Sequence, residues 1–236
     1  MESLIKYVYP DAHICAFSEN ETIISNRNSI VFVDNPISYK GLYHGLYKRF
    51  AGKHAKLIAY GRPQELESIY NDFDCSGIGE LKLYKWVDGD VEGDIKELTE
   101  NLPTIKKIGC PVWFHCDIDG PIDRVAKIIQ NLPNKFVWCH AGVGENCEDI
   151  SGTLAKAVEY QAKLPNLWIE ISWLVLDYLV LRPDLLNRFD KGRLLIGTDN
   201  NPISNNPENV QIVINLQKFT NYNHTKLYQD LFCDVK

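Results

Sequence analysis

The feature that most constrains the fold is a series of eight short apolar runs, separated along most of the chain by longer stretches of helical character. The runs are rich in Val, Ile, Leu, Phe and Trp, which is typical of strands covered on both faces. Strands that alternate with helices pair in parallel through right-handed crossover connections. We therefore expect a parallel sheet with strands at residues 8–16, 29–34, 55–60, 78–84, 111–116, 135–140, 167–172 and 193–198.

Helical patterns fill most of the gaps between these strands. Residues 120–133 repeat apolar side chains at helical spacing and stop at Pro133. Pro103 lies within another helical stretch, which predicts either a kinked helix or two short ones. The first gap, residues 17–28, is polar and too short for a full helix. Further helices are expected at residues 62–73, 94–109, 151–165, 174–190, 207–219 and 224–234.

Eight such units in 236 residues predict a single domain, residues 1–236, of the α/β class. The expected architecture is a compact (β/α)8 TIM barrel with a short first β-α unit, a fold of typically ~250 residues. The alternative is an open doubly wound sheet. The glycine-rich first turn of that architecture is missing from this sequence, so the barrel is favoured.

Composition narrows the class of protein. The net charge is -6 and there is no block of Lys or Arg, whereas a nucleic-acid groove normally carries a basic stripe. No apolar run approaches the ~18 residues of a membrane span, and the start of the chain does not resemble a signal peptide. Seven cysteines without a framework spacing indicate free thiols in a reducing compartment. We expect a cytoplasmic protein with a small-molecule substrate, no nucleic-acid or membrane partner, and homo-oligomerisation left open.

Four of the predicted strands end in polar residues that can bind a metal. In a barrel, active-site residues come from the carboxyl ends of the strands. Neutral imidazole and carboxylate groups that converge there form a site for a divalent cation, with zinc favoured above other metals. The residues are His13, His115, His140 and Asp199.

Because side chains alternate between the two faces of a strand, the sequence also predicts which residues share a face with these histidines. Trp113 should share the inward face with His115, and Trp138 should share it with His140. Cys139, on the opposite face, should then pack against helices as a small hydrophobic residue, and so should Cys116.

Four motifs resemble those of a known family. The stretches "PDAHICAF", "PVWFHCD", "FVWCHAGVG" and "RLLIGTDN" are similar to the strand-one, strand-five, strand-six and strand-eight motifs of the amidohydrolase superfamily. Within it, the chain resembles the amidohydrolase-2 group of TIM-barrel metal-dependent hydrolases, which also includes decarboxylases. The similarity runs from about residue 8 to residue 200, and "KLYQDLFCD" resembles the family's terminal helix.

The resemblance implies a role for each motif residue. His13, His115 and Asp199 would bind one divalent metal, and His140 would lie beside it, where relatives polarise the substrate or the metal-bound water. The family motif in strand one is His-x-His, whereas this chain has His13-Ile14-Cys15. Cys15 is therefore a further candidate ligand, and whether its shorter side chain reaches the metal is left open.

Charged residues on two inner strand faces have two interpretations. Glu80 and Lys82 share a face in strand four, where some amidohydrolases carry a carbamylated lysine that bridges two metals. The alternative, which we favour, is an interior ion pair. Glu170 and Ser172 form a similar inward pair on strand seven. Lys82 and Trp173, just beyond strand seven, are also candidate substrate-binding residues.

The resemblance implies metal-assisted hydrolysis of a small amide, lactone or ester. A divalent cation lowers the pKa of a bound water from about 15.7 towards about 7. Asp199 would accept the proton of this water and deliver it to the leaving group, while His140 would stabilise the oxyanion or orient the water. Two alternatives remain: a decarboxylase of a carboxylated small molecule on the same site, and a non-catalytic member of the family that only binds a ligand or partner.

Overall fold

Eight strands follow one another in the computed structural model at the places where the apolar runs predict them. The structure describes residues 14–16, 30–33, 56–59, 63–83, 91–144, 146–172, 174–199 and 207–232. The strands are β1 (Ile14–Ala16), β2 (Ile30–Val33), β3 (Lys56–Ala59), β4 (Gly77–Lys82), β5 (Val112–His115), β6 (Phe136–Trp138), β7 (Leu167–Ile171) and β8 (Leu194–Ile196). Where the residues that follow a strand are described, from β4 to β8, each strand ends one or two residues earlier than predicted.

All seven neighbouring strand pairs are parallel, and the order in the sheet is the order in the chain, from β1 to β8. An open doubly wound sheet would instead reverse its strand order at a switch point. Sequential parallel order with intervening helices is that of a (β/α)8 barrel, so the predicted fold is confirmed.

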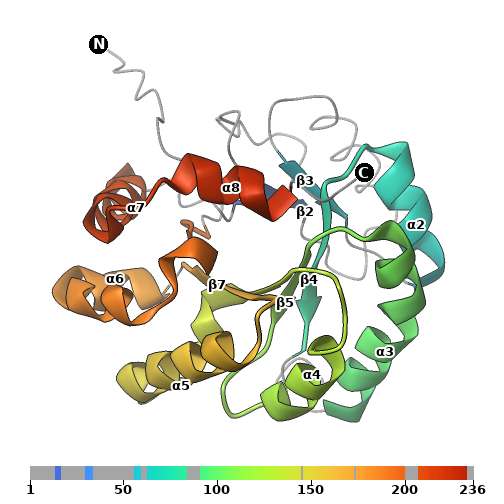
Figure 1. The fold of residues 1–236 in the computed structure, drawn as a ribbon, viewed down its shortest axis with the longest axis horizontal. Helices are drawn as coiled ribbons and strands as arrows, with labels where there is room; N and C mark the ends of the chain where they lie inside the picture. The colour runs from blue at the N-terminus through green and yellow to red at the C-terminus, as the bar shows by residue number, and fades with distance from the viewer. Residues whose placement is uncertain are drawn as a thin grey trace.

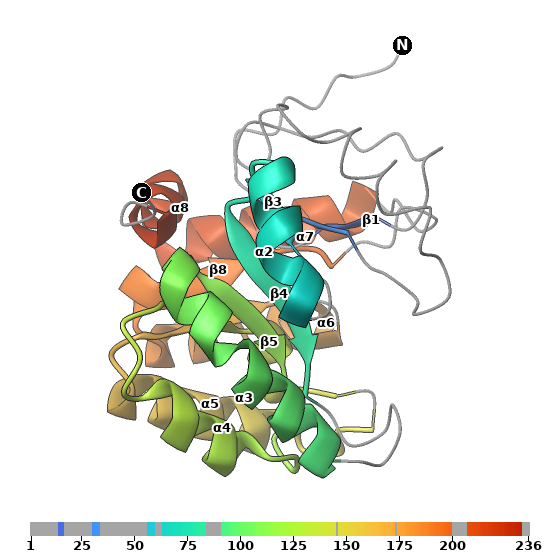
Figure 2. The ribbon, with the colours of Figure 1, turned by 90° about the vertical axis from the view of Figure 1, so that its right-hand side faces the viewer.

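Helices cover the outside of this sheet. Figure 1 shows α2 to α7 following one another around the strands, with α8 lying inside that ring, and Figure 2 shows α2 and α3 in front of β4 and β5. Within the described ranges, no helix is both long and apolar enough to cross a membrane. The helices are α2 (Pro63–Asp72), α3 (Val91–Ile108), α4 (Ile122–Ile129), α5 (Ile150–Lys163), α6 (Leu174–Leu181), α7 (Pro207–Thr220) and α8 (His224–Phe232), with 3-10 turns η1 (Cys139–Gly142), η2 (Pro183–Arg188) and η3 (Lys191–Arg193).

Two prolines act differently on their helices. Pro103 lies inside α3, which continues through it as one helix from Val91 to Ile108. Pro183 ends the helix predicted at 174–190: α6 stops at Leu181 and the chain continues as the 3-10 turn η2. A proline disfavours helical geometry in the residue before it, so the single helix predicted there is wrong.

The strands separate two apolar layers. Their outward side chains, such as Phe114 and Trp138, pack with the surrounding helices in the larger cluster. The inward side chains form a smaller cluster with α8, in which Trp113 and Leu227 are fully buried. Lys135, just before β6, donates a hydrogen bond to the carbonyl of Asp230 at 2.6 Å. Helix α8 thus closes the amino-terminal end of the strands with apolar side chains.

The alternation of side chains along a strand correctly predicts which residues of β5 face inward. It fails for the residues at the end of β6. Trp113 faces inward as His115 does, while Cys116 packs with the helix-side cluster as expected. Trp138 faces the helices, donates a hydrogen bond to the carbonyl of Cys116 and contacts Tyr160 of α5. Cys139 belongs to the inner cluster. The predicted facing of Trp138 and Cys139 is wrong, because β6 ends at Trp138 and a turn, not a strand, carries the residues that follow.

We predict that Leu227→Ala lowers the free energy of unfolding by about 2–5 kcal/mol, because it leaves a cavity in a fully buried layer. Lys226→Ala, on the exposed side of the same helix, should change it by less than ~0.5 kcal/mol. Urea unfolding followed by circular dichroism measures both. Equal stability of the two variants would show that α8 is not part of the core.

Candidate metal centre

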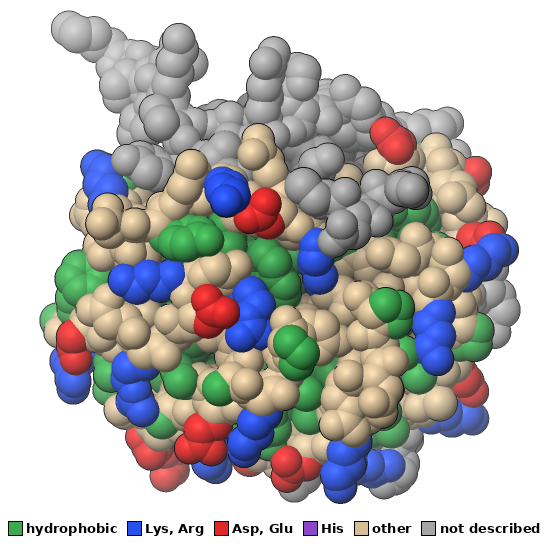
Figure 3. Space-filling model, viewed as in Figure 1, with side chains coloured by type: hydrophobic (Ala, Val, Ile, Leu, Met, Phe, Trp, Pro, Cys, Tyr) green, Lys and Arg blue, Asp and Glu red, His purple; other side chains and the backbone are tan. Residues whose placement is uncertain are grey.

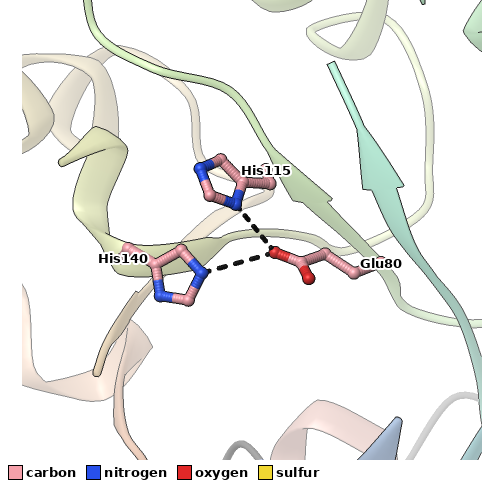
Figure 4. Close-up of side chains that lie close together, drawn as sticks. All are labelled: Glu80, His115 and His140. Carbon is pink, nitrogen blue, oxygen red and sulfur yellow. Dashed lines mark ion pairs between the residues drawn. The ribbon is translucent and has the colours of Figure 1, made fainter. Parts of the chain in front are cut away.

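Three side chains from neighbouring strands meet around one carboxylate oxygen. Glu80 Oε1 lies 3.2 Å from Nδ1 of His115 and 3.4 Å from Nε2 of His140. The two imidazole rings are 4.7 Å apart between centroids and meet edge to face. Figure 4 shows both rings turned toward the Glu80 carboxylate, which reaches them from β4. We call Glu80, His115 and His140 the triad.

The triad has the spacing of metal ligands. Nitrogen and oxygen ligands lie about 2.0–2.2 Å from zinc, so two ligands of one tetrahedral ion lie roughly 3.3–3.6 Å apart. The two contacts of Glu80 Oε1 are at or near this range, and the three ligand atoms all lie within 4.8 Å of one another. One carboxylate and two imidazoles also make a common ligand set of catalytic zinc, with a position left for water. The triad therefore fits a divalent cation.

Gly79 lets β4 place Glu80 against β5. Its φ is 134°, and a Cβ atom at this position would lie 2.5 Å from the carbonyl oxygen of Trp113. Only glycine tolerates both the conformation and the close approach of the two backbones. The pairing of β4 with β5 also shifts register between Ile78 and Leu81. Such irregularities re-aim side chains near functional sites, and here the shift spans Glu80.

A left-handed turn aims His140. After β6 the chain enters η1, where φ is 56° at His140, 53° at Ala141 and 78° at Gly142. This region is costly for residues other than glycine and persists only where surrounding contacts hold it. A side chain at Gly142 would also collide with the ring of Trp138. The turn thus carries His140, rather than Trp138, to the inner face.

Each histidine has a second polar partner on the ring nitrogen that faces away from Glu80. Asp117 Oδ1 lies 3.1 Å from Nε2 of His115, and Ser172 Oγ lies 2.7 Å from Nδ1 of His140. Partners of this kind orient metal-binding imidazoles and choose which nitrogen carries the lone pair. Both rings are buried, His115 being 7% and His140 2% exposed. Among the described residues on the face drawn in Figure 3, no histidine side chain is visible.

The pocket favours positive charge. Burial opposes the charged form of His115, but hydrogen bonds and charge from Asp117 and Glu80 outweigh it and raise the pKa of the imidazole from 6.5 to about 9. The metal-free site thus holds a proton on His115 at neutral pH. A metal cation that binds there must displace this proton.

Asp199 lies next to the triad. Its Oδ2 is 3.9 Å from Nε2 of His140, and its own φ is 50°, directly after β8. The carboxylate is 18% exposed, compared with 11% for that of Glu80. Asp199 is therefore close enough to exchange a proton with a molecule bound beside His140 and is in contact with solvent.

Solved structures of other proteins superimpose on nearly the whole chain. A Pseudomonas putida protein assigned as a 2-pyrone-4,6-dicarboxylic acid hydrolase is 14% identical, with a TM-score of 0.62 over 94% of this chain and 93% of its own. An Acinetobacter baumannii protein with the same assignment, solved with citric acid bound, is 12% identical, with a TM-score of 0.60 over 95% and 99%. Amidohydrolase 2 from Bifidobacterium longum subsp. infantis is 12% identical, with a TM-score of 0.59 over 95% and 98%.

The chain has the TIM-barrel fold of the amidohydrolases. No protein-family profile and no curated protein sequence matches it. At these low identities the likeness establishes the fold, and the chemistry must be argued from the side chains of this amidohydrolase-fold barrel.

The structure brings together three of the residues predicted for the site, His115, His140 and Asp199. Lys82 is the last residue of β4 and pairs in register with His115, which places it at the same end of the barrel. Other predicted residues lie outside the described part of the chain, so their roles stay predictions: His13, Trp173 and the side chain of Cys15.

Glu80 is the member of the triad that the sequence did not assign to the metal. The sequence favoured an interior ion pair with Lys82, which stays a prediction, and the structure shows that the Glu80 carboxylate contacts both histidines. The position of Glu80 in the sequence could have indicated this role. It is an inward-facing residue near the end of strand four, and the neighbouring strand five ends in His115. Alternation alone could not decide between Lys82 and a histidine as its partner.

We predict that the metal-free protein loses stability between pH 6.5 and 9. The folded state holds a proton on His115 that the unfolded state releases above about 6.5, so the stabilisation is complete below that pH and lost through about 9. The loss should be on the order of 3 kcal/mol relative to His115→Asn, since one pKa unit corresponds to about 1.4 kcal/mol. Urea unfolding with chelator present, at both pH values, measures it. Identical pH dependence of parent and variant would contradict the raised pKa.

Proposed function

We propose that this protein is a metal-dependent hydrolase of a small amide, lactone or ester. The observation that carries the proposal is the triad, a carboxylate and two imidazoles at zinc-ligand spacing at the carboxyl ends of neighbouring barrel strands. In barrels of this kind these ends form the active site, whereas the opposite end serves stability. Here that opposite end is closed by the apolar side chains of α8.

The triad would hold one divalent cation, zinc being the best fit to two imidazoles and one carboxylate. When bound, such an ion polarises a substrate carbonyl and lowers the pKa of water. We assign His140 to the ligand set because its Nε2 faces the same Glu80 oxygen as His115 does. His13 and Cys15 remain candidates to complete the set.

Asp199 is the proposed proton carrier. Its carboxylate lies beside the triad and is in contact with solvent, so it can accept a proton from the attacking water. The same group then delivers that proton to the leaving nitrogen or oxygen as the substrate bond breaks. General acid–base catalysis of this kind contributes typically about 10²–10⁴-fold to the rate.

We further propose that the substrate carries a carboxylate, which Lys82 binds, and Trp173 stays a candidate substrate-binding residue. Lys82 pairs with His115 in the register of β4 and β5. It lies two residues beyond Glu80, on the same face of β4. Two of the structural neighbours are assigned as hydrolases of a cyclic ester with two carboxylates, and one of them holds citric acid. Both ligands are anionic, as this arrangement requires.

The cysteines support the proposal of a cytoplasmic protein with a small-molecule substrate. Those that the structure describes are free thiols, and four of the five are buried. Burial raises the pKa of the Cys75 and Cys110 thiols to about 12, which keeps them protonated and unreactive. Free thiols are typical of proteins in a reducing compartment, where disulfides rarely form.

Metal binding gives the first test. The protein purified without chelator should carry close to one equivalent of a divalent metal, measured by elemental analysis. Glu80→Gln should weaken zinc binding at least about tenfold, because a ligand charge is lost while the side-chain shape is kept. Glu148→Gln, an exposed position, is the matched control and should bind as the parent does. Absence of metal, with no uptake from zinc buffer, would reject the hydrolase and favour a binding protein.

Asp199→Asn tests the proton carrier. On any ester, lactone or amide that the parent cleaves, the variant should lose at least about 10²-fold in kcat. Asp177→Asn makes the same charge change on the exposed side of α6 and should keep full activity. An Asp199→Asn variant as active as the parent would remove Asp199 from the mechanism. Release of carbon dioxide rather than a hydrolysis product would identify a decarboxylase.

A further inference from the structure

A buried chain of hydrogen bonds lies behind His140. Nδ1 of His140 is 2.7 Å from Ser172 Oγ, and Ser172 Oγ donates to Glu170 Oε2 at 3.0 Å. The backbone N–H of His140 donates to that same oxygen at 3.0 Å. Glu170 and Ser172 are 0% exposed and His140 is 2% exposed. Glu170 of β7 and Ser172, directly after that strand, thus hold both the backbone and the ring of a residue that follows β6.

One arrangement of hydrogens satisfies all three hydrogen bonds of this chain. Glu170 Oε2 accepts from a backbone N–H, which is always a donor, and from the Ser172 hydroxyl. The hydroxyl has a single hydrogen, which it gives to Glu170, so toward His140 it offers a lone pair. Nδ1 of the neutral imidazole must therefore carry the hydrogen. The lone pair of the ring is then on Nε2, the nitrogen that faces Glu80 Oε1 at 3.4 Å.

We propose that Ser172 and Glu170 are positioning residues that hold His140 in the Nδ1–H tautomer and present its Nε2 lone pair to the triad. The choice of tautomer follows from the hydrogen bonds behind the ring, and it turns the Nε2 lone pair toward the carboxylates of Glu80 and Asp199, between which a cation would lie. Its consequence for metal binding rests on the proposed function. An imidazole held in the other tautomer would present a hydrogen to the cation and could not bind it.

The same carboxylate also holds the backbone of the turn. His140 has a φ of 56°, a conformation that costs a non-glycine residue of order 1–3 kcal/mol unless its surroundings hold it. The hydrogen bond from its N–H to Glu170 is part of that support. Glu170 therefore acts on the position of His140 through the main chain and on its tautomer through Ser172. A ring held at both points reaches the triad in one orientation.

The two histidines of the triad complement each other. His115 presents Nδ1 to Glu80 and Nε2 to the carboxylate of Asp117, whereas His140 presents Nε2 to Glu80 and Nδ1 to the Ser172 hydroxyl. Each ring has an acceptor on its outer nitrogen. The two rings thus turn opposite nitrogens toward Glu80, Nδ1 in His115 and Nε2 in His140.

Nitrogen NMR of the histidine rings tests the proposal in the metal-free parent. Signals lost in His140→Gln assign the ring. We expect a protonated Nδ1 and an unprotonated Nε2 in His140. Ser172→Ala should weaken this preference, because Glu170 Oε2 is 3.8 Å from Nδ1, beyond hydrogen-bond distance. Zinc affinity, measured by competition with a chromogenic chelator, should fall about 10–100-fold in the same variant.

The control is Thr153→Val, which removes another buried hydroxyl, in contact with Cys147 on the outer side of the barrel. It should leave both the His140 tautomer and the zinc affinity as in the parent. A parent His140 protonated on Nε2, or an unchanged tautomer in Ser172→Ala, would overturn the proposal. If the parent shows the expected tautomer, Ser172→Ala loses it and neither protein binds zinc, the positioning role stands and the proposed metal-dependent function fails.

Discussion

The site depends on one constraint, the common direction of all eight strands. Because they run parallel and in chain order, every residue at a carboxyl end lies at the same end of the sheet. Glu80 and His115 lie on β4 and β5, His140 lies in the turn after β6, and Asp199 follows β8. These side chains converge because the strands that carry or precede them all end at the same end of the barrel. The backbone at each strand end then sets the direction in which each side chain points.

Charge is the second organising factor. The two imidazoles lie among the carboxylates of Glu80, Asp117 and Glu170, and all of these groups are largely buried. Buried carboxylates are costly unless a cation or hydrogen-bond donors compensate them. The raised pKa of His115, about 9, shows that this pocket takes up a proton where it can. A metal ion would supply the same positive charge, which links the electrostatics of the triad to the proposed chemistry.

The barrel keeps this polar end apart from an apolar one. Along β5, Trp113 belongs to the inner apolar layer, and His115, two residues further on the same face, belongs to the triad. Helix α8 completes the apolar layer with Leu227, Tyr228 and Leu231. Stability and chemistry are thus placed at opposite ends of the same strands. Changes in one layer can be expected to leave the other largely intact.

The sequence by itself determined the eight strands, their parallel order and the strand ends at which His115, His140 and Asp199 lie, because hydrophobic periodicity and chain order are local properties. Only the tertiary structure decided which groups touch. The partner of Glu80 depends on the register shift beside Gly79, and the facing of Trp138 and Cys139 depends on a left-handed turn after β6. The link from His140 through Ser172 to Glu170 joins residues 30 and 32 positions apart. Backbone conformation and contacts between strands set these features, and a pattern of residue types does not contain them.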